Sequence, residues 1–244
     1  MEEIENENKA KENQILLIDN YSYGYPTDRI KRIETIINDC MTDVSSRVVH
    51  YSQFNYELAR NSIGIILSGS NLNVSSFYYN FKLKKQFDEI MKLIRTTEET
   101  PVLAICFGIH LVAYAYDAQV CRMRIPDLGG KFIFLVLNET DFLINHKNIP
   151  VDVHHLDFVN PNDCKIQNSF DIKSISRTKG YRIIQYMTHK TKPIYSIQFH
   201  PETHNTLYFH SGLFDERIID KTRVIGKEII ENFLWMCYIK KNHK

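Results

Sequence analysis

The residue best suited to chemistry is Cys106, in the stretch PVLAICFGIH at residues 101–110. An apolar run leads into this cysteine, and Phe107, Gly108 and a second apolar run follow it. A nucleophile between a strand and a helix sits on a tight turn that exposes its side chain at the top of a sheet. The first turn of the helix adds N–H groups and a positive dipole end, which favour a thiolate and a developing oxyanion. Taken alone, the segment also fits a buried structural cysteine.

A second segment, IQFHPE at residues 197–202, carries a histidine and a carboxylate close together. A thiol nucleophile needs a base within hydrogen-bond reach, and that base needs an acceptor that fixes its tautomer. His200 has the chemistry of the base and Glu202 that of the acceptor. The chain holds 10 histidines, so a strand-end histidine beside a surface acid is the alternative for this segment alone.

A third segment, ILSGSNLN at residues 66–73, follows another apolar run. Gly69 lets the backbone approach a ligand closely or adopt a positive φ. The carboxyl ends of the strands line the ligand crevice of a doubly wound sheet. We therefore expect this loop beside the Cys106 turn, each offering a backbone N–H. An ordinary turn between a strand and a helix is the alternative.

The elements that must position these residues alternate in the first half of the chain. Strands are expected at residues 14–19, 47–51, 62–68 and 101–105, and helices from Pro26 to Cys40 and at 81–94 and 107–117. Strands that alternate with helices predict an α/β fold with a parallel, doubly wound sheet.

The second half of the chain is rich in strand-like segments with few helices between them. These segments lie at residues 132–137, 151–154, 171–176, 182–187 and 193–199. Antiparallel pairing is expected there, followed by a helix at 222–238. Residues 203–221 have no clear period and are expected to form a loop or insertion. We expect one domain over residues 14–240 and a disordered tail at 1–13, which has too few apolar groups to offset ordering entropy.

The composition excludes several functional classes. Lys plus Arg is 30 and Asp plus Glu is 29, so the chain lacks the basic excess of a general nucleic-acid binder. The cysteines number 5 and form no C-x-x-C pair, which argues against a zinc ribbon or a disulfide framework. No secretory signal and no apolar run of the roughly 18–20 residues that span a bilayer is visible. A cytoplasmic protein without a membrane partner is expected.

A metal site is the weakest of the chemical interpretations. His154 and His155 precede Asp157, but adjacent residues on a strand point to opposite faces. Both histidines therefore cannot easily bind one ion, and we expect neither a metal nor a cofactor.

Together, the three segments resemble the class I (triad-type) glutamine amidotransferase family. The family pattern is a strand with a Gly-rich loop, G-x-C-x-G-x-Q and Q-F-H-P-E. Here those elements read ILSGSN, A-I-C-F-G-I-H and Q-F-H-P-E, over roughly residues 14–238. The resemblance implies a flavodoxin-like, mostly parallel sheet flanked by helices, with an antiparallel section in the second half.

Finer resemblance points in two directions. HKTKPIYSIQFHPE and the HHLDFV stretch at residues 154–159 look like the glutaminase subunit of GMP synthetase. ILLIDNY looks more like the amidotransferase component of anthranilate or aminodeoxychorismate synthase. The segment 203–221 fits neither and leaves open the related gamma-glutamyl hydrolases and peptidases.

The resemblance also implies roles for individual residues. Cys106 would attack the side-chain amide of glutamine, His200 would move the proton and Glu202 would orient His200. The N–H groups of Phe107 and Ser70 would form the oxyanion hole. Gly69 and His110 would contact the substrate as well. Ammonia would pass to a separate, ATP-dependent synthetase subunit.

This sequence departs from the family around the substrate. Ser70 stands in place of a glycine, Asn71 of a proline, Ala104 of a glycine, His110 of a glutamine and His154 of a serine. A positive φ at Ser70 would cost about 1–3 kcal/mol. Two alternatives therefore stay open: a hydrolase of another gamma-glutamyl compound, and a non-catalytic binding subunit.

Overall fold

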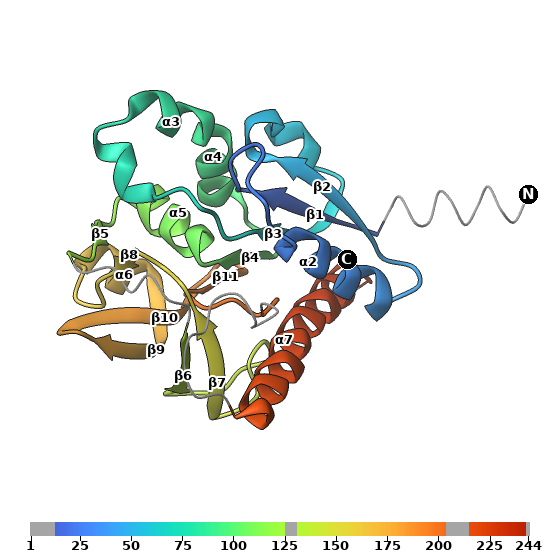
Figure 1. Cartoon of the computed structure of the whole chain (residues 1–244). Helices are drawn as coiled ribbons and strands as arrows, with labels where there is room; N and C mark the ends of the chain where they lie inside the picture. Colours follow the sequence, from blue (N-terminus) through green and yellow to red (C-terminus); the bar gives the residue numbers. More distant parts are fainter. Residues whose placement is uncertain (1–12, 125–130, 204–214, 243–244) are drawn as a thin grey trace, which may run out of the picture.

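The computed structural model of the chain describes residues 13–124, 131–203 and 215–242. A central seven-stranded sheet organises them (Figure 1). Its order is β2 (Ser45–His50), β1 (Gln14–Asp19), β3 (Ser62–Leu67), β4 (Val102–Ile105), β11 (Ile194–Ile197), β10 (Tyr181–His189) and β9 (Phe170–Thr178). The strands from β2 to β11 are parallel, and β10 and β9 each run antiparallel to their neighbour. The predicted α/β fold with a mostly parallel sheet and an antiparallel section is confirmed.

The remaining elements surround this sheet. The helices are α2 (Arg29–Cys40), α3 (Phe81–Gln86), α4 (Asp88–Thr96), α5 (Phe107–Ala115), α6 (Cys164–Ser169) and α7 (Glu216–Asn242). Short 3-10 turns lie at η1 (Tyr51–Gln53), η2 (Tyr56–Ala59) and η3 (Val74–Tyr78). Two small antiparallel sheets pair β5 (Val120–Arg122) with β8 (Asp157–Val159) and β6 (Lys131–Val136) with β7 (Asn148–Val153).

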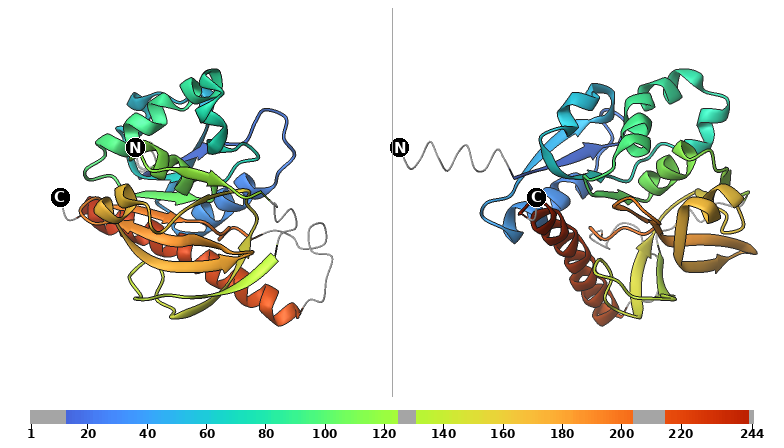
Figure 2. Two further views of the ribbon diagram at one scale, coloured as in Figure 1. Left: turned by 90° about the vertical axis from the view of Figure 1, so that its left-hand side faces the viewer. Right: turned by 180° about the vertical axis from the view of Figure 1, so that it is seen from behind.

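The central strands are apolar throughout because both faces of the sheet are covered. In β1, Leu16 and Ile18 belong to a core that also contains apolar residues of α4 and α5. Ile15 and Leu17 point the other way, into a core shared with α2 and α7. Figure 2 shows these two helix pairs from further directions. All four β1 side chains are fully buried, as the unbroken apolar run predicts.

Two predicted helices have different bounds in the structure. The first begins at Arg29 rather than at Pro26, which lies in the preceding loop. The helix predicted at 81–94 is divided into α3 and α4 at Phe87. Phe87 is fully buried, and its ring stacks on Tyr51 with centroids 4.4 Å apart. The helix is interrupted where this aromatic residue enters the core.

The C-terminal helix is longer than the sequence pattern indicated. α7 begins at Glu216 instead of 222, because Ile219 is buried and extends the apolar stripe of the helix. Residues 204–214 of the predicted loop lie outside the described residues, as does the predicted tail except for Asn13. The Asn13 carbonyl accepts a 3.0 Å hydrogen bond from the Ser45 N–H. No helix in the described part of the chain has the length and apolar composition needed to cross a membrane.

α7 also packs closely against the segment that follows β11. A Cβ atom at Gly226 would collide with the backbone carbonyl oxygen of Pro201 and would lie 2.8 Å from its carbonyl carbon. Pro201 stands between His200 and Glu202, so this contact fixes the backbone that carries both side chains.

We expect Gly226→Ala to destabilise the protein by about 1–3 kcal/mol, because the added methyl group must displace either α7 or the Pro201 segment. In a helix with free space at the substituted position, Gly→Ala stabilises a protein by up to about 1 kcal/mol. The sign of the change in unfolding free energy therefore shows whether the position is closely packed. Urea denaturation measures it. Val224→Ala, at a site 66% exposed on the same helix, is the control and should stay within about 0.5 kcal/mol of the parent. A more stable Gly226→Ala protein would show that the close packing is wrong.

Candidate active site

Cys106 lies on the turn between β4 and α5, as the sequence predicts. Its backbone has φ 51° and ψ −97°, a conformation that costs a non-glycine residue about 1–3 kcal/mol. The Cys106 N–H donates a 2.8 Å hydrogen bond to the carbonyl of Ile197 at the end of β11. The sheet therefore joins the cysteine directly to the segment that carries His200.

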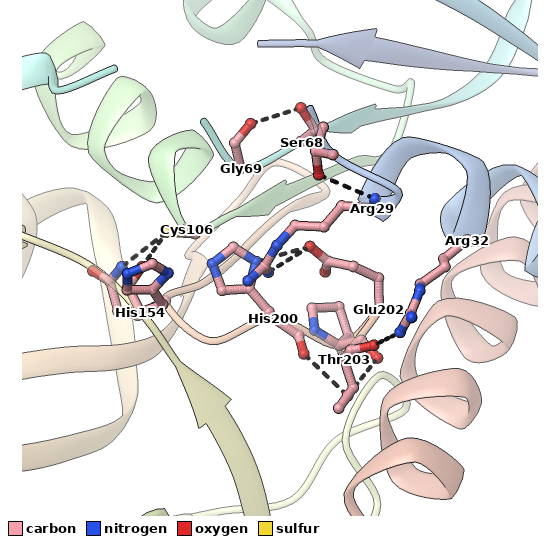
Figure 3. Close-up of polar contacts among 12 residues, drawn as sticks. Arg29, Arg32, Ser68, Gly69, Cys106, His154, His200, Glu202 and Thr203 are labelled. Carbon is pink, nitrogen blue, oxygen red and sulfur yellow. Dashed lines mark hydrogen bonds and ion pairs between the residues drawn. The ribbon is translucent and has the colours of Figure 1, made fainter. Parts of the chain in front are cut away.

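His200 and Glu202 form a buried pair beside this turn (Figure 3). His200 Nδ1 and Glu202 Oε1 are 2.8 Å apart. The His200 backbone N–H donates to the carbonyl of Asp152 at 2.9 Å, which ties the pair to β7. The structure thus brings together the three residues that the sequence analysis selected as nucleophile, base and acceptor.

Arg29 is a member of the site that the sequence analysis missed. Its Nη1 atom lies 3.0 Å from Glu202 Oε1, and the two side chains are only 4% and 1% exposed. Arg29 begins α2 on the same face as the buried Ile33 and Ile37. A basic residue within an apolar stripe is the signal that could have identified it.

The electrostatics of this cluster favour ionised partners. Burial alone would raise the pKa of Glu202, but the charges and hydrogen bonds of His200 and Arg29 hold it well below its usual range. Burial and Arg29 lower the pKa of His200. The charges of Cys106 and Glu202 and a hydrogen bond with Cys106 outweigh them and raise this pKa to about 9. At neutral pH His200 is therefore protonated and Glu202 is negatively charged.

The loop after β3 approaches the same histidine. A Cβ atom at Gly69 would lie 2.8 Å from His200 Cε1, so close approach rather than a positive φ requires the glycine. Ser70 is absent from the described residues that have a positive φ, and the strain expected there does not arise. Its hydroxyl donates to the Asn20 carbonyl at 2.6 Å and accepts from the Leu72 N–H at 2.9 Å. Serine is therefore accommodated in this loop by hydrogen bonding.

His110 and Gln198 lie on another side of the cysteine. His110 Nε2 is 2.8 Å from Gln198 Oε1, and Gln198 Nε2 is 3.7 Å from Cys106 Sγ. All three side chains are buried. Burial lowers the pKa of His110. Gln198 was missed although it lies within the IQFHPE segment, because the sequence alone does not show which way its amide points.

These groups meet at a cavity of about 920 Å³. All but two of the predicted site residues line it. Those that do are Ser70, Cys106, Phe107, His110 and His200. Glu202 lies behind His200, and Gly69 contacts the His200 ring instead of lining the cavity.

The two adjacent histidines do not follow the sequence interpretation. His154 and His155 lie between β7 and β8 rather than on a strand, and both line the cavity. The expectation that they lie on a strand is therefore wrong. Among the described residues, no three His, Cys, Asp or Glu side chains converge as metal ligands would.

Comparisons with known proteins agree with this geometry. The family described as glutamine amidotransferase class-I matches residues 17–219. A subunit of the glutamine-hydrolyzing GMP synthase of Methanocaldococcus jannaschii is 31% identical over 151 residues, which cover 60% of this chain and 65% of that protein. The glutamine-hydrolyzing GMP synthase of Petrotoga mobilis is 33% identical over 197 residues, which cover 79% of this chain and 33% of that protein. The chain thus spans less than two thirds of either relative.

The fold is similar to a solved structure as well. A crystal structure described as that of a GMP synthase subunit from Thermoplasma acidophilum superposes with a TM-score of 0.69 at 21% identity, covering 95% of this chain and 96% of that one. At this identity the superposition establishes the fold, and the sequence match establishes the family. The chain belongs to the class I glutamine amidotransferase family.

Proposed function

We propose that this protein is a glutaminase that hydrolyses the side-chain amide of glutamine and supplies ammonia to a separate synthetase, as a GMP-synthase-like amidotransferase would. The observation that carries the proposal is the buried arrangement in which Cys106 and His200 line one cavity and Glu202 contacts His200 from behind. The strained turn at Cys106 supports it, since such strain concentrates at functional sites.

In this mechanism the Cys106 thiolate attacks the amide carbon of glutamine while His200 holds the proton. The carbonyl oxygen becomes an oxyanion, for which Phe107 and Ser70 offer backbone N–H groups. The intermediate collapses, the C–N bond breaks, and the leaving ammonia takes the proton from His200. A gamma-glutamyl thioester remains. Water then attacks the thioester, His200 accepts its proton, and the sulfur leaves as glutamate is released.

Glu202 and Arg29 keep His200 ready for both steps. Glu202 accepts from His200 Nδ1 and stabilises the imidazolium. Arg29 supplies a positive charge at Oε1 of Glu202, the same oxygen that His200 contacts. Because Arg29 helps to hold the carboxylate ionised, Glu202 can act as an acceptor although its side chain is almost fully buried.

The synthetase partner is inferred from the relatives. One relative is named as one subunit of its synthase, and the chain matches a third of the other, a larger synthase. A second, ATP-dependent subunit would use the ammonia. We place this reaction in the cytoplasm, where all five cysteines, which are free in the structure, stay reduced.

The cavity favours a second candidate function. Its volume of about 920 Å³ is near the upper end of the roughly 300–1,000 Å³ typical of ligand sites. His110 also replaces the glutamine of the family pattern. A gamma-glutamyl hydrolase that accepts a compound larger than glutamine would use the same three catalytic groups.

Cys106→Ala should lower glutamate release by about 10⁴-fold or more, because the thioester can no longer form. Glutamine and gamma-glutamyl dipeptides should be assayed side by side, since preference for a dipeptide selects the second candidate. Cys164→Ala removes an exposed cysteine and should keep full activity. A Cys106→Ala protein that still hydrolyses its substrate would exclude this nucleophile. A folded parent that hydrolyses neither substrate would favour a binding subunit.

Arg29→Met should destabilise the protein by about 1–3 kcal/mol at neutral pH, because it removes one of the two buried cations that contact Glu202. The depressed pKa of Glu202 contributes stability that is fully present above pH about 4, where the carboxylate is ionised in the unfolded chain too. This contribution is lost as the pH falls below that value toward the folded pKa, so the deficit should shrink there. Denaturation at several pH values measures both effects. Arg60→Met, which breaks an exposed pair with Glu57, should cost less than about 1 kcal/mol. Equal losses in the two variants would contradict the assigned role of Arg29.

Protonated His200 should stabilise the fold in a defined pH range. Its pKa is raised from 6.5 to about 9, so the stabilisation is complete below pH 6.5 and disappears as the pH rises through 9. The thermal midpoint of the parent should fall over this range, and that of His200→Gln should fall less. Parallel curves for the two proteins would show that His200 is neutral in the folded state.

A further inference from the structure

We propose that Gln198 is a positioning residue that donates its side-chain N–H to the Cys106 sulfur, and that His110 sets the direction of the Gln198 amide. The proposal rests on the proposed function in which Cys106 is the nucleophile. It assigns His110 to the support of the nucleophile, whereas its position in the family pattern implies a contact with substrate.

Besides its hydrogen bond with His200, Cys106 Sγ has two contacts that suit opposite protonation states. The sulfur lies 3.6 Å from the His154 carbonyl oxygen, which can accept from an S–H group but repels a thiolate. It lies 3.7 Å from Gln198 Nε2, which can only donate. Gln198 therefore favours the thiolate over the thiol, because a hydrogen bond to the charged form stabilises that form.

The orientation of the Gln198 amide follows from its second contact. An amide side chain has one acceptor end and one donor end. His110 Nε2 lies 2.8 Å from the acceptor end, so a hydrogen on Nε2 holds that oxygen away from the sulfur. The donor end then faces Cys106. A reversed amide would place its oxygen against the sulfur and destabilise the thiolate.

The backbone and the burial of these residues restrict other arrangements. The Gln198 side chain is fully buried, and His110 is 3% exposed. The Gln198 N–H donates to the Gln185 carbonyl at 2.9 Å, which anchors the residue to β10. Because burial lowers the pKa of His110, its ring is neutral and has one N–H to give. The ring has hydrogen-bond partners in Gln198 and in the backbone of Asp157, and we place the N–H on Nε2, toward Gln198.

The alkylation of Cys106 by iodoacetamide tests the proposal without requiring glutamine turnover. The rate is measured as a function of pH, and peptide mass spectrometry separates Cys106 from the other cysteines. In Gln198→Met, which keeps the length but loses the donor, the pH midpoint should rise by about one unit, so the thiolate is about tenfold scarcer below it. Gln198→Glu places a carboxylate near the sulfur and should raise the midpoint further.

His110 is tested by a pair of variants. His110→Met removes the donor and should raise the midpoint, whereas His110→Gln retains an N–H for Gln198 and should leave it near the parent value. If the two variants shift the midpoint equally, His110 does not orient the amide. The proteins are compared after circular dichroism confirms that they are folded, and Gln198→Glu replaces Gln198→Met if the latter does not fold.

A matched control comes from the neighbouring strand. Gln185 is also a buried glutamine, but its amide donates to Ser176 Oγ at 2.9 Å instead of to the sulfur. Gln185→Met should leave the alkylation midpoint unchanged. An unchanged midpoint in Gln198→Met, or an equal shift in Gln185→Met, would overturn the proposal. A shifted midpoint in a protein that does not hydrolyse glutamine would retain this proposal and reject the proposed function.

Discussion

The strained backbone at Cys106 is the constraint on which the rest of the site depends. A φ of 51° persists only because the elements on either side of the residue are fixed. β4 lies in the sheet between β3 and β11, and α5 is buried along most of its length. The parallel register pairs Ile197 with Ile105, so the residues that follow β11 lie beside Cys106. The sheet thus sets both the exposure of the nucleophile and the approach of its base.

A row of buried charges also positions the base of the site. Arg29, Glu202 and His200 come from α2 and from the segment after β11, and they meet in a region that is almost closed to water. Each charge there is tolerated because a partner of opposite sign touches it. The contact of Gly226 with Pro201 links this row to α7, so the helix that covers one face of the sheet also holds the base in place.

The sequence predicts more of the fold and the catalytic groups than of their surroundings. β1 occupies residues 14–19 as expected, because a strand buried on both faces is apolar throughout. Short motifs that can be recognised from local spacing contain Cys106, His200 and Glu202. Arg29 pairs with Glu202 across 173 residues, and no local pattern encodes that contact. Phe87 interrupts a helix only because of the aromatic rings that surround it. Side-chain directions, such as that of the Gln198 amide, likewise depend on tertiary neighbours.

The central claim is that Cys106 is an activated thiol in a cavity that accepts glutamine. The most direct measurement is covalent labelling with a glutamine-mimicking electrophile, followed by intact-mass and peptide mass spectrometry. The account predicts a single adduct on Cys106, formed more slowly when glutamine is present. A folded protein whose Cys106 stays unlabelled, or is labelled at the same rate with and without glutamine, would contradict the account.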